Sequence, residues 1–236
     1  MPNSFRGNDI LYKPRNNPKI YYGLLHQKRE AELLLSALRL DIFSQLESWS
    51  TPEEVAEKTG YDRRNLGFFL NALASVKFIE KKENRYRNTS QSDEYLNRNS
   101  PVYMGECILF REDMMSLRNL DMRIKDGPDA EVVSRNMGVE VYDFYESARV
   151  SVPEMYTGRV QAFTQAVKKL FSDTPPSRIL DLGGGSGIMA IETVSAYPDS
   201  RGAIFEHPSV AELPRSLVRE RGLSGRIEVL SGDFNY

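Results

Sequence analysis

The sequence has few cysteines, few histidines and no long apolar run. Its 236 residues include one cysteine and two histidines. The single Cys107 has no partner for an internal disulfide, so the sequence does not point to an oxidising compartment. No run of about 18 apolar residues occurs, which excludes a transmembrane helix, and the polar opening segment does not resemble a secretory signal. We therefore expect a cytoplasmic protein without membrane association.

A surplus of either charge is also missing. The chain has 31 Lys and Arg residues against 33 Asp and Glu residues, a formal net charge of −2. Proteins that bind nucleic acids usually carry a basic surplus, so this balance argues against a nucleic-acid partner. Apolar residues make up 40% of the chain, which is enough for a packed core in one large or two small domains.

The front of the chain combines a polar arm with a pattern of helices and a hairpin. Residues 1–18 are expected to form a flexible arm, and an apolar helix follows it. Residues 51–54 read Thr-Pro-Glu-Glu, a capping box with proline in the first turn, and Asp62 caps a further helix. Residues 77–88 alternate as a β-hairpin does. This order predicts a winged-helix domain over residues 19–100.

A second, mostly helical stretch covers residues 101–172. Residues 126–130 (DGPDA) interrupt it. Residues 151–154 (SVPE) read as another capping box and predict a helix that runs towards residue 170. Two prolines at positions 175 and 176 end this helix and mark a domain boundary.

After residue 177 the apolar pattern changes to short strands separated by helices. The strands are expected at residues 178–182, 203–206 and 226–230. Strand–helix–strand–helix–strand order predicts a parallel, doubly wound sheet of the Rossmann-like type. The fold class is therefore α/β for residues 173–236, preceded by an α+β winged-helix domain.

The most informative segment is a glycine-rich turn after the first of these strands, Asp181-Leu182-Gly183-Gly184-Gly185-Ser186-Gly187. Such a turn lets a ligand approach the backbone where a side chain would block it. The dinucleotide fingerprint G-x-G-x-x-G/A does not fit, because Ile188 occupies its third small position. The glycines instead have the spacing G-x-G-x-G, with an acid two residues before the first.

This pattern resembles the first motif of class I methyltransferases that use S-adenosylmethionine (SAM), which implies SAM as the cofactor. By that resemblance Asp181, Gly183 and Gly185 surround the methionine part of SAM, whose sulfonium and ammonium groups suit an acid. In the family, the residues at Asp233 and Phe234 flank the adenine. The alternative for Asp233 is that it only caps the next turn.

Glu206 closes the second strand, 23 positions after Gly183. An acid there can accept hydrogen bonds from both ribose hydroxyls, as in dinucleotide-binding folds. The alternative is a solvated surface acid. Three motif elements in order, at the ends of three strands, predict cofactor binding more strongly than the turn alone. Gly184 is interpreted as a turn residue only.

The front segments narrow the resemblance to small-molecule O-methyltransferases of the caffeate, hydroxyindole and polyketide type. Residues 51–56 (TPEEVA), 70–75 (LNALAS) and 86–89 (YRNT) look like segments of that family. The resemblance implies methyl transfer to a hydroxyl of a small, aromatic molecule. It also implies a homodimer formed through the front domain, which contributes to the partner's active site.

Candidate acceptor contacts come from the helical stretch. Six of the eight methionines fall between Met104 and Met155, where they could line an adaptable pocket or pack as ordinary core. Tyr145, Met155 and Arg159 are the candidate substrate residues, with an exposed helix-surface position as the alternative for Arg159. No metal ligands are assigned.

A DNA-binding winged helix is the competing interpretation of the front domain. Residues 50–100 hold nine basic and eight acidic residues. The helix that would enter a groove starts with Arg63 and Arg64 but is apolar afterwards, with Phe68 beside Phe69. A helix that reads DNA needs a polar exposed face. The sequence therefore favours a subunit interface.

The catalytic base is not assigned. Relatives usually use a histidine beyond the fourth strand, followed by Asp and Trp, and neither His26 nor His207 matches that position. A seven-stranded methyltransferase sheet needs four more strands after Phe234, or about 100 residues. Three explanations stay open: a truncated chain, a second chain that supplies the rest, or a degenerate protein that binds SAM without catalysis. We favour the first.

Overall fold

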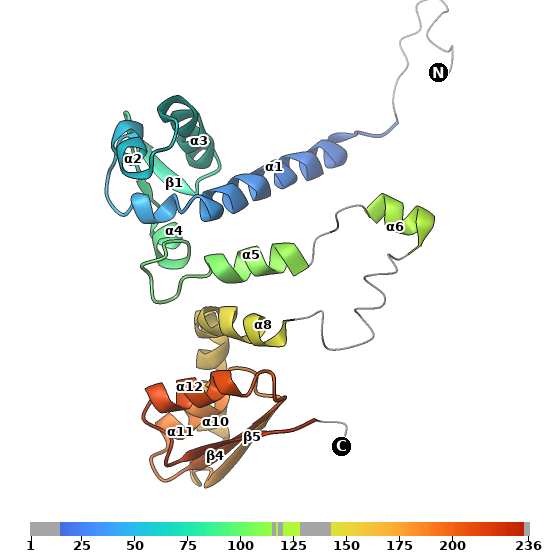
Figure 1. Ribbon diagram of the computed structural model, residues 1–236, viewed down its shortest axis with the longest axis vertical. Coiled ribbons are helices and arrows are strands. Elements are labelled where there is room, and N and C mark those ends of the chain that lie inside the picture. The colour runs from blue at the N-terminus through green and yellow to red at the C-terminus, as the bar shows by residue number, and fades with distance from the viewer. Residues whose placement is uncertain (1–14, 115–116, 118–119, 128–142, 234–236) are drawn as a thin grey trace, which may run out of the picture.

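The computed structural model describes residues 15–114, 117, 120–127 and 143–233. Phe234, most of the expected arm and part of the expected break at 126–130 lie outside this portion of the chain. Figure 1 shows a front unit of helices and a hairpin at one end, a sheet with helices at the other, and further helices between them. None of the helices in the described ranges is both long and apolar enough to span a bilayer.

Helices and one hairpin form the front unit. Its elements are α1 (Lys19–Arg39), the short η1 (Phe43–Gln45), α2 (Pro52–Thr59), α3 (Arg63–Ser75), β1 (Ile79–Lys82), β2 (Arg85–Asn88) and α4 (Ser90–Tyr95). The capping box before α2 is confirmed: the Thr51 hydroxyl accepts the Glu54 N–H at 3.2 Å, and the Glu54 carboxylate accepts the Thr51 N–H at 2.7 Å. Asp62 caps α3 by accepting the Asn65 N–H at 2.8 Å. Both helix starts are local properties of the sequence.

One apolar core holds the front unit together. Its buried side chains come from α1, η1, α2, α3 and the hairpin, and they include Phe43, Leu70 and Tyr86. Tyr86 donates its hydroxyl hydrogen to Asn71 Oδ1 at 2.9 Å, so its one polar side-chain atom is satisfied. Ser50 pairs with Tyr86 in an antiparallel bridge. A third short extended segment therefore lies beside the hairpin.

Helical segments connect the two ends of the molecule. They are α5 (Gly105–Met114), α6 (Leu120–Asp126), α8 (Phe144–Val150), α9 (Val152–Glu154), the π-helical turn η2 (Met155–Arg159) and α10 (Val160–Leu170). The capping box expected at residues 151–154 is wrong. Ser151 has helical dihedrals, because it follows α8 directly, and its side chain accepts no capping hydrogen bond. The expected continuous helix is also broken, at Thr157 and Gly158.

Charged side chains join α5 to α8, which packs beside it (Figure 1), and to α9. Arg149 Nη2 donates to Glu106 Oε2 at 2.8 Å. Arg111 pairs with Glu154, and the buried Cys107 thiol lies 3.7 Å from the same Glu154 carboxylate. Two ion pairs thus connect α5 to the helices that precede the sheet.

Three parallel strands carry the C-terminal unit. They are β3 (Arg178–Leu182), β4 (Arg201–Glu206) and β5 (Ile227–Ser231), in the order β3-β4-β5, connected by α11 (Ile188–Ala196) and α12 (Glu212–Glu220). The predicted parallel pairing is confirmed. α11 and α12 cover the face that carries Ile179, Ile204 and Ile227, with α10 beside α11. On the other face Leu180 and Leu182 are 64% and 67% exposed. Among the described residues, helices therefore cover one face, and the doubly wound arrangement stays a prediction.

Candidate functional site

The glycine turn joins the end of β3 to the start of α11. Gly183, Gly185 and Gly187 have φ of 69°, 57° and 70°, a left-handed conformation that residues with a Cβ rarely adopt. The Gly183 N–H donates to Phe205 O at 2.9 Å, and the Gly187 N–H donates to Gly184 O at 2.8 Å. The alternate glycines of the sequence motif are therefore the ones that the backbone requires.

Glu206 ends β4 directly beside this turn. It is only 7% exposed, and both of its carboxylate oxygens accept backbone hydrogen bonds. Oε2 accepts the N–H of Gly185 at 2.6 Å, and Oε1 accepts the N–H of His207 at 2.7 Å. The alternative of a solvated surface acid is therefore wrong, because the carboxylate is a fixed part of the turn.

A cavity of about 600 Å³ lies between the glycine turn and α8. Residues 183–186 and Glu206 form one wall. Phe144 and Ala148 of α8, together with Met155 of η2, contribute to the other wall. The cavity thus combines fixed polar groups on one side with a largely apolar surface on the other, as small-molecule sites commonly do.

Asp181 lies beneath the turn and does not line this cavity. A Cβ on Gly184 would be 2.8 Å from Asp181 Cγ, so the absent side chain makes room for the carboxyl group. Asp181 Oδ2 is buried, and within the described part of the chain it has no hydrogen-bond partner. Burial raises the pKa of Asp181, a hydrogen bond from the Ala190 backbone opposes the shift, and the Glu206 charge adds to it. Gly184 therefore has a packing role that the sequence did not reveal.

Asp233 follows β5 at the same edge of the sheet. The Gly232 N–H before it donates to Glu206 O at 3.1 Å, so the chain beyond β5 stays close to the end of β4. The carboxyl ends of the three strands meet at one edge, as parallel pairing requires. Phe234, which was expected to act with Asp233, lies outside the described residues.

The three substrate candidates are placed differently. Met155 lines the cavity. Tyr145 is 38% exposed and is not part of the lining. Arg159 is turned towards Glu154, with 3.5 Å between Arg159 Nη2 and Glu154 Oε1. Of the three, only Met155 reaches the cavity.

Sequence reasoning missed the small residues that α8 presents to the glycine turn. Ala148 Cβ is 3.9 Å from the position that a Cβ on Gly185 would occupy. Ser147 and Ser151 also line the cavity. Phe144, Ser147 and Ser151 are three and four residues apart, and this helical spacing was the available signal.

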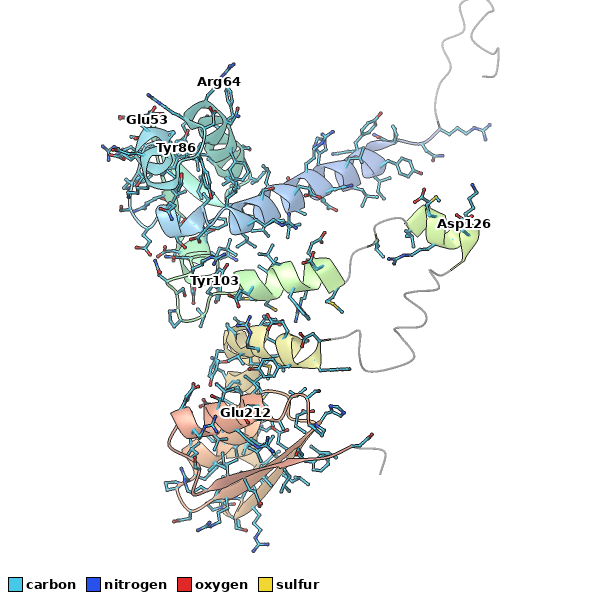
Figure 2. The ribbon with its side chains drawn as sticks, viewed as in Figure 1. Glu53, Arg64, Tyr86, Tyr103, Asp126 and Glu212 are labelled. Atoms are coloured by element: carbon cyan, nitrogen blue, oxygen red, sulfur yellow. The ribbon has the colours of Figure 1, made fainter. Side chains whose placement is uncertain are left out.

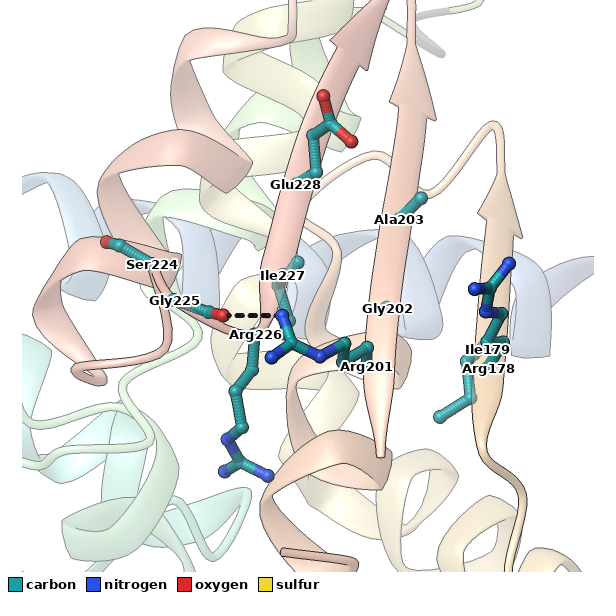
Figure 3. Close-up of a pocket in the computed structure, with 10 residues that line it drawn as sticks. All are labelled: Arg178, Ile179, Arg201, Gly202, Ala203, Ser224, Gly225, Arg226, Ile227 and Glu228. Carbon is teal, nitrogen blue, oxygen red and sulfur yellow. Dashed lines mark hydrogen bonds between the residues drawn. The ribbon is translucent and has the colours of Figure 1, made fainter. Parts of the chain in front are cut away.

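A second cavity, of about 550 Å³, lies at the opposite ends of the strands (Figure 3). Arg178, Arg201 and Arg226 line it. Arg226 donates to three backbone carbonyls at the end of α11, and Arg201 donates to Gly225 O at 3.2 Å. Ligands of open parallel sheets bind at the carboxyl ends of the strands. The cavity beside the glycine turn is therefore the candidate site.

Neither histidine lines that cavity. His26 is on α1, and His207 Nδ1 is 2.8 Å from Ser209 Oγ. In the ranges that the structure describes, no cluster of His, Cys, Asp and Glu could hold a metal ion. The geometry, like the sequence, leaves the catalytic base unassigned.

Comparisons with known proteins agree with the geometry. A family model described as an O-methyltransferase domain matches residues 118–236. The chain is 28% identical over 211 residues to the N,N-dimethyltransferase OxyT of Streptomyces rimosus, which covers 87% of this chain and 61% of that protein. It is 27% identical over 215 residues to the 3-hydroxy-5-methyl-1-naphthoate 3-O-methyltransferase of Streptomyces sahachiroi, covering 87% and 60%.

Solved structures share the fold. PigF with SAH superposes with a TM-score of 0.74 at 17% identity, over 92% of this chain and 67% of that chain. An O-methyltransferase family protein from Burkholderia thailandensis gives 0.70 at 21% identity, over 93% and 65%. The chain spans about 60% of the length of the two curated relatives. Because the family model matches half of the chain, the protein belongs to the O-methyltransferase domain family, as the sequence resemblance predicted.

Proposed function

We propose that this protein binds SAM in the cavity beside the glycine turn and transfers its methyl group to a hydroxyl of a small, aromatic molecule. The observation that carries the proposal is the placement of Gly183, Gly185 and the buried Glu206 carboxylate around one cavity. A volume of about 600 Å³ falls within the range of cofactor sites. The fold relative PigF, solved with SAH, supports the same cofactor class.

The acids of the site suit SAM, which carries a sulfonium and an ammonium group and no phosphate. Glu206 is proposed to accept hydrogen bonds from the ribose hydroxyls. Asp181 is proposed to balance the positive charge of the methionine end from beneath the turn, and its buried Oδ2, which has no hydrogen-bond partner among the described residues, supports this. Asp233 and Phe234 are proposed to flank the adenine.

When bound, SAM supplies a methyl group that the acceptor oxygen takes in an in-line displacement, while the C–S electron pair returns to sulfur. The residues of the cavity hold the two reactants in line, which is the main contribution that such a site makes. Phe144 and Met155 provide an apolar wall against which a flat acceptor can lie. The acceptor proton passes to a general base, which stays unassigned.

The proposed acceptor is a phenolic hydroxyl. The relative from Streptomyces sahachiroi is named for methyl transfer to an oxygen of a hydroxynaphthoate. OxyT, a comparably similar relative, is named as an N,N-dimethyltransferase. An aromatic amine is therefore the second acceptor class to test.

Calorimetric titration of the full-length protein with S-adenosylhomocysteine (SAH) tests the cofactor assignment. We expect one SAH per cavity. An intact, folded protein that gives no heat would overturn the proposal. An assay with phenols and aromatic amines then tests catalysis. Binding without transfer to any acceptor would favour the alternative of a SAM-binding, non-catalytic subunit.

We further propose that residues 19–100 form a winged-helix domain that mediates a homodimer. The order of helices and hairpin supports the domain, and so does the extended segment at Ser50. Tyr21, Leu24 and Leu25 on α1 are 69%, 60% and 52% exposed. In the proposed homodimer, the second copy buries this apolar face of α1. Light scattering tests this: wild type should have the mass of a dimer and Leu24→Glu that of a monomer. A monomeric wild type would contradict it.

DNA binding by the front unit is the weaker candidate. The two arginines that open α3 are engaged within the protein. Arg63 pairs with Glu53 at 2.5 Å, and Arg64 lies over the Phe68 ring, 5.7 Å from its centroid. Phe68 is 61% exposed, which suits an apolar partner. We expect no retardation of duplex DNA in a mobility-shift assay.

We also propose that further strands pair with β3 and that helices cover the second face of the sheet. Among the described strands, β3 pairs with β4 alone. The exposure of Leu180 and Leu182 supports the proposal, because an apolar, unpaired strand favours association. The same polypeptide or a second chain can supply these parts. Intact mass of the native protein, with analysis of whatever co-purifies, distinguishes the two.

The proposed boundary between the helical region (101–172) and the cofactor domain (173–236) is supported by the end of α10 at Leu170 and the start of β3 at Arg178. A cytoplasmic location stays our expectation, and the free, buried thiol of Cys107 is compatible with it.

A further inference from the structure

Three consecutive residues, Glu154, Met155 and Tyr156, each contact a different part of the molecule. Glu154 pairs with Arg111 of α5. Met155 lines the cavity beside the glycine turn. Tyr156 contacts the helices that cover the sheet. This segment therefore lies where α5, the cavity and the helices that cover the sheet meet.

Tyr156 is held by a closed triangle of polar contacts. Its hydroxyl donates to Glu192 Oε1 of α11 at 2.6 Å and accepts from Arg221 Nη2 at 2.8 Å. Arg221 Nη1 in turn donates to Glu192 Oε1 at 3.0 Å. The guanidinium also lies 6.0 Å from the centre of the Tyr156 ring. Each of the three side chains is therefore hydrogen-bonded to the other two. Such networks can stabilise a structure more than the same number of isolated hydrogen bonds does.

The regular helical bonding of the backbone ends just after Met155, whose N–H still donates to Ser151 O at 3.1 Å. Thr157 and Gly158 leave the helical region, and Gly158 has φ 135° and ψ −28°. π-helical turns of this kind interrupt the ordinary ladder of a helix. Beyond Met155 the helix is interrupted, so side-chain contacts such as those of Tyr156 add to the backbone bonds that hold this segment.

We propose that Tyr156 is a positioning residue. Its hydrogen bonds with Glu192 and Arg221 hold Met155 in the wall of the cavity, and the position of Met155 sets the affinity of the cavity for the cofactor. This inference rests on the proposed function, because it takes SAM as the occupant. Tyr156 itself does not line the cavity. It acts through its neighbour.

A double-mutant cycle on the full-length protein tests the inference, with SAH affinity measured by calorimetry. Tyr156→Phe removes only the hydroxyl, and we expect SAH binding about fivefold weaker, within the usual range of coupling between touching residues. Met155→Ala removes the side chain of Met155 itself from the cavity wall. In the Met155→Ala background, Tyr156→Phe should change SAH affinity little, because the residue through which it acts is gone. An equal effect in both backgrounds, or none in wild type, would overturn the inference.

Tyr86→Phe is the matched control. It also removes a hydroxyl that donates to a side-chain oxygen, Asn71 Oδ1 at 2.9 Å, but in the core of the front unit. It should lower the melting temperature as Tyr156→Phe does and leave SAH affinity unchanged. If Tyr86→Phe weakened SAH binding as much, the effect of Tyr156 would be one of general stability. Absence of SAH binding in wild type would instead overturn the proposed function, and the inference with it.

Discussion

Glu206 and Gly185 are joined by a 2.6 Å hydrogen bond between a carboxylate oxygen and a backbone N–H. The acid at the end of β4 therefore shapes the turn that follows β3. The second oxygen of Glu206 accepts the His207 N–H at 2.7 Å, which fixes the orientation of the carboxylate. Two motif elements that are 21 residues apart in the chain form one structural unit.

Glu206→Gln is expected to weaken SAH binding. The amide keeps one acceptor oxygen and puts an NH2 group in place of the other, so a ribose hydroxyl of the proposed cofactor loses its acceptor. An unsatisfied buried group costs about 1–3 kcal/mol, or about 5- to 150-fold in affinity. Calorimetric titration measures this. Glu212→Gln on the exposed surface of α12, where Glu212 pairs with Arg219, should leave affinity unchanged.

Gly187→Ala is expected to destabilise the C-terminal unit. The residue has φ of +70°, and an added Cβ would be 2.5 Å from Ile204 Cδ1 and 3.2 Å from Pro214 Cβ. Left-handed strain and overpacking together cost about 2–4 kcal/mol, which urea unfolding would detect. Gly225→Ala is the control, since a Cβ there meets nothing within 4 Å. Equal stability of the two variants would contradict the close packing at Gly187.

Asp181 is expected to make stability depend on pH. Burial raises the pKa of this carboxyl in the folded protein above its unfolded value of about 3.9. Its contribution to stability is therefore fully present below that pH and is lost as pH rises through the folded pKa. Asp181→Asn removes this loss, so the stability of the variant relative to wild type should increase as pH is raised from about 4. Unfolding curves at several pH values test the sign, and parallel profiles would refute it.

Thr51→Ala is expected to affect the fold and not the site. It removes the hydroxyl that accepts the Glu54 N–H at the start of α2, and loss of such a cap costs about 1 kcal/mol. The melting temperature should fall, while SAH affinity should stay as in wild type. A change in SAH affinity would show that the front unit influences the cavity.

What the sequence predicted correctly depends on short-range interactions. The caps at Thr51 and Asp62 involve partners three residues away, and the glycine spacing reflects backbone dihedrals within one turn. The order of strands and helices likewise gave the parallel sheet. These features follow from local patterns, so a single sequence contains them.

What the sequence could not predict depends on neighbours that are distant along the chain or on the direction from which the chain arrives. Ser151 has the residues of a capping box but follows α8 directly, so it never adopts the extended conformation that a cap needs. Gly184 looked like a plain turn residue, because its contact with Asp181 exists only in three dimensions. Ser147 and Ala148 line the cavity only because α8 packs against the glycine turn, and the sequence alone does not predict that packing.

The junction between α5 and the helices that precede the sheet is held by Arg149 with Glu106 and by Arg111 with Glu154. The screening length of the solvent falls to about 3 Å at 1 M ionic strength, so concentrated salt weakens such attractions between exposed charges. The apolar interiors on either side respond in the opposite sense, since strongly hydrated salts such as sulfate favour burial. Concentrated sulfate is therefore expected to weaken the ion pairs between α5 and these helices, while it stabilises the apolar cores on either side of them.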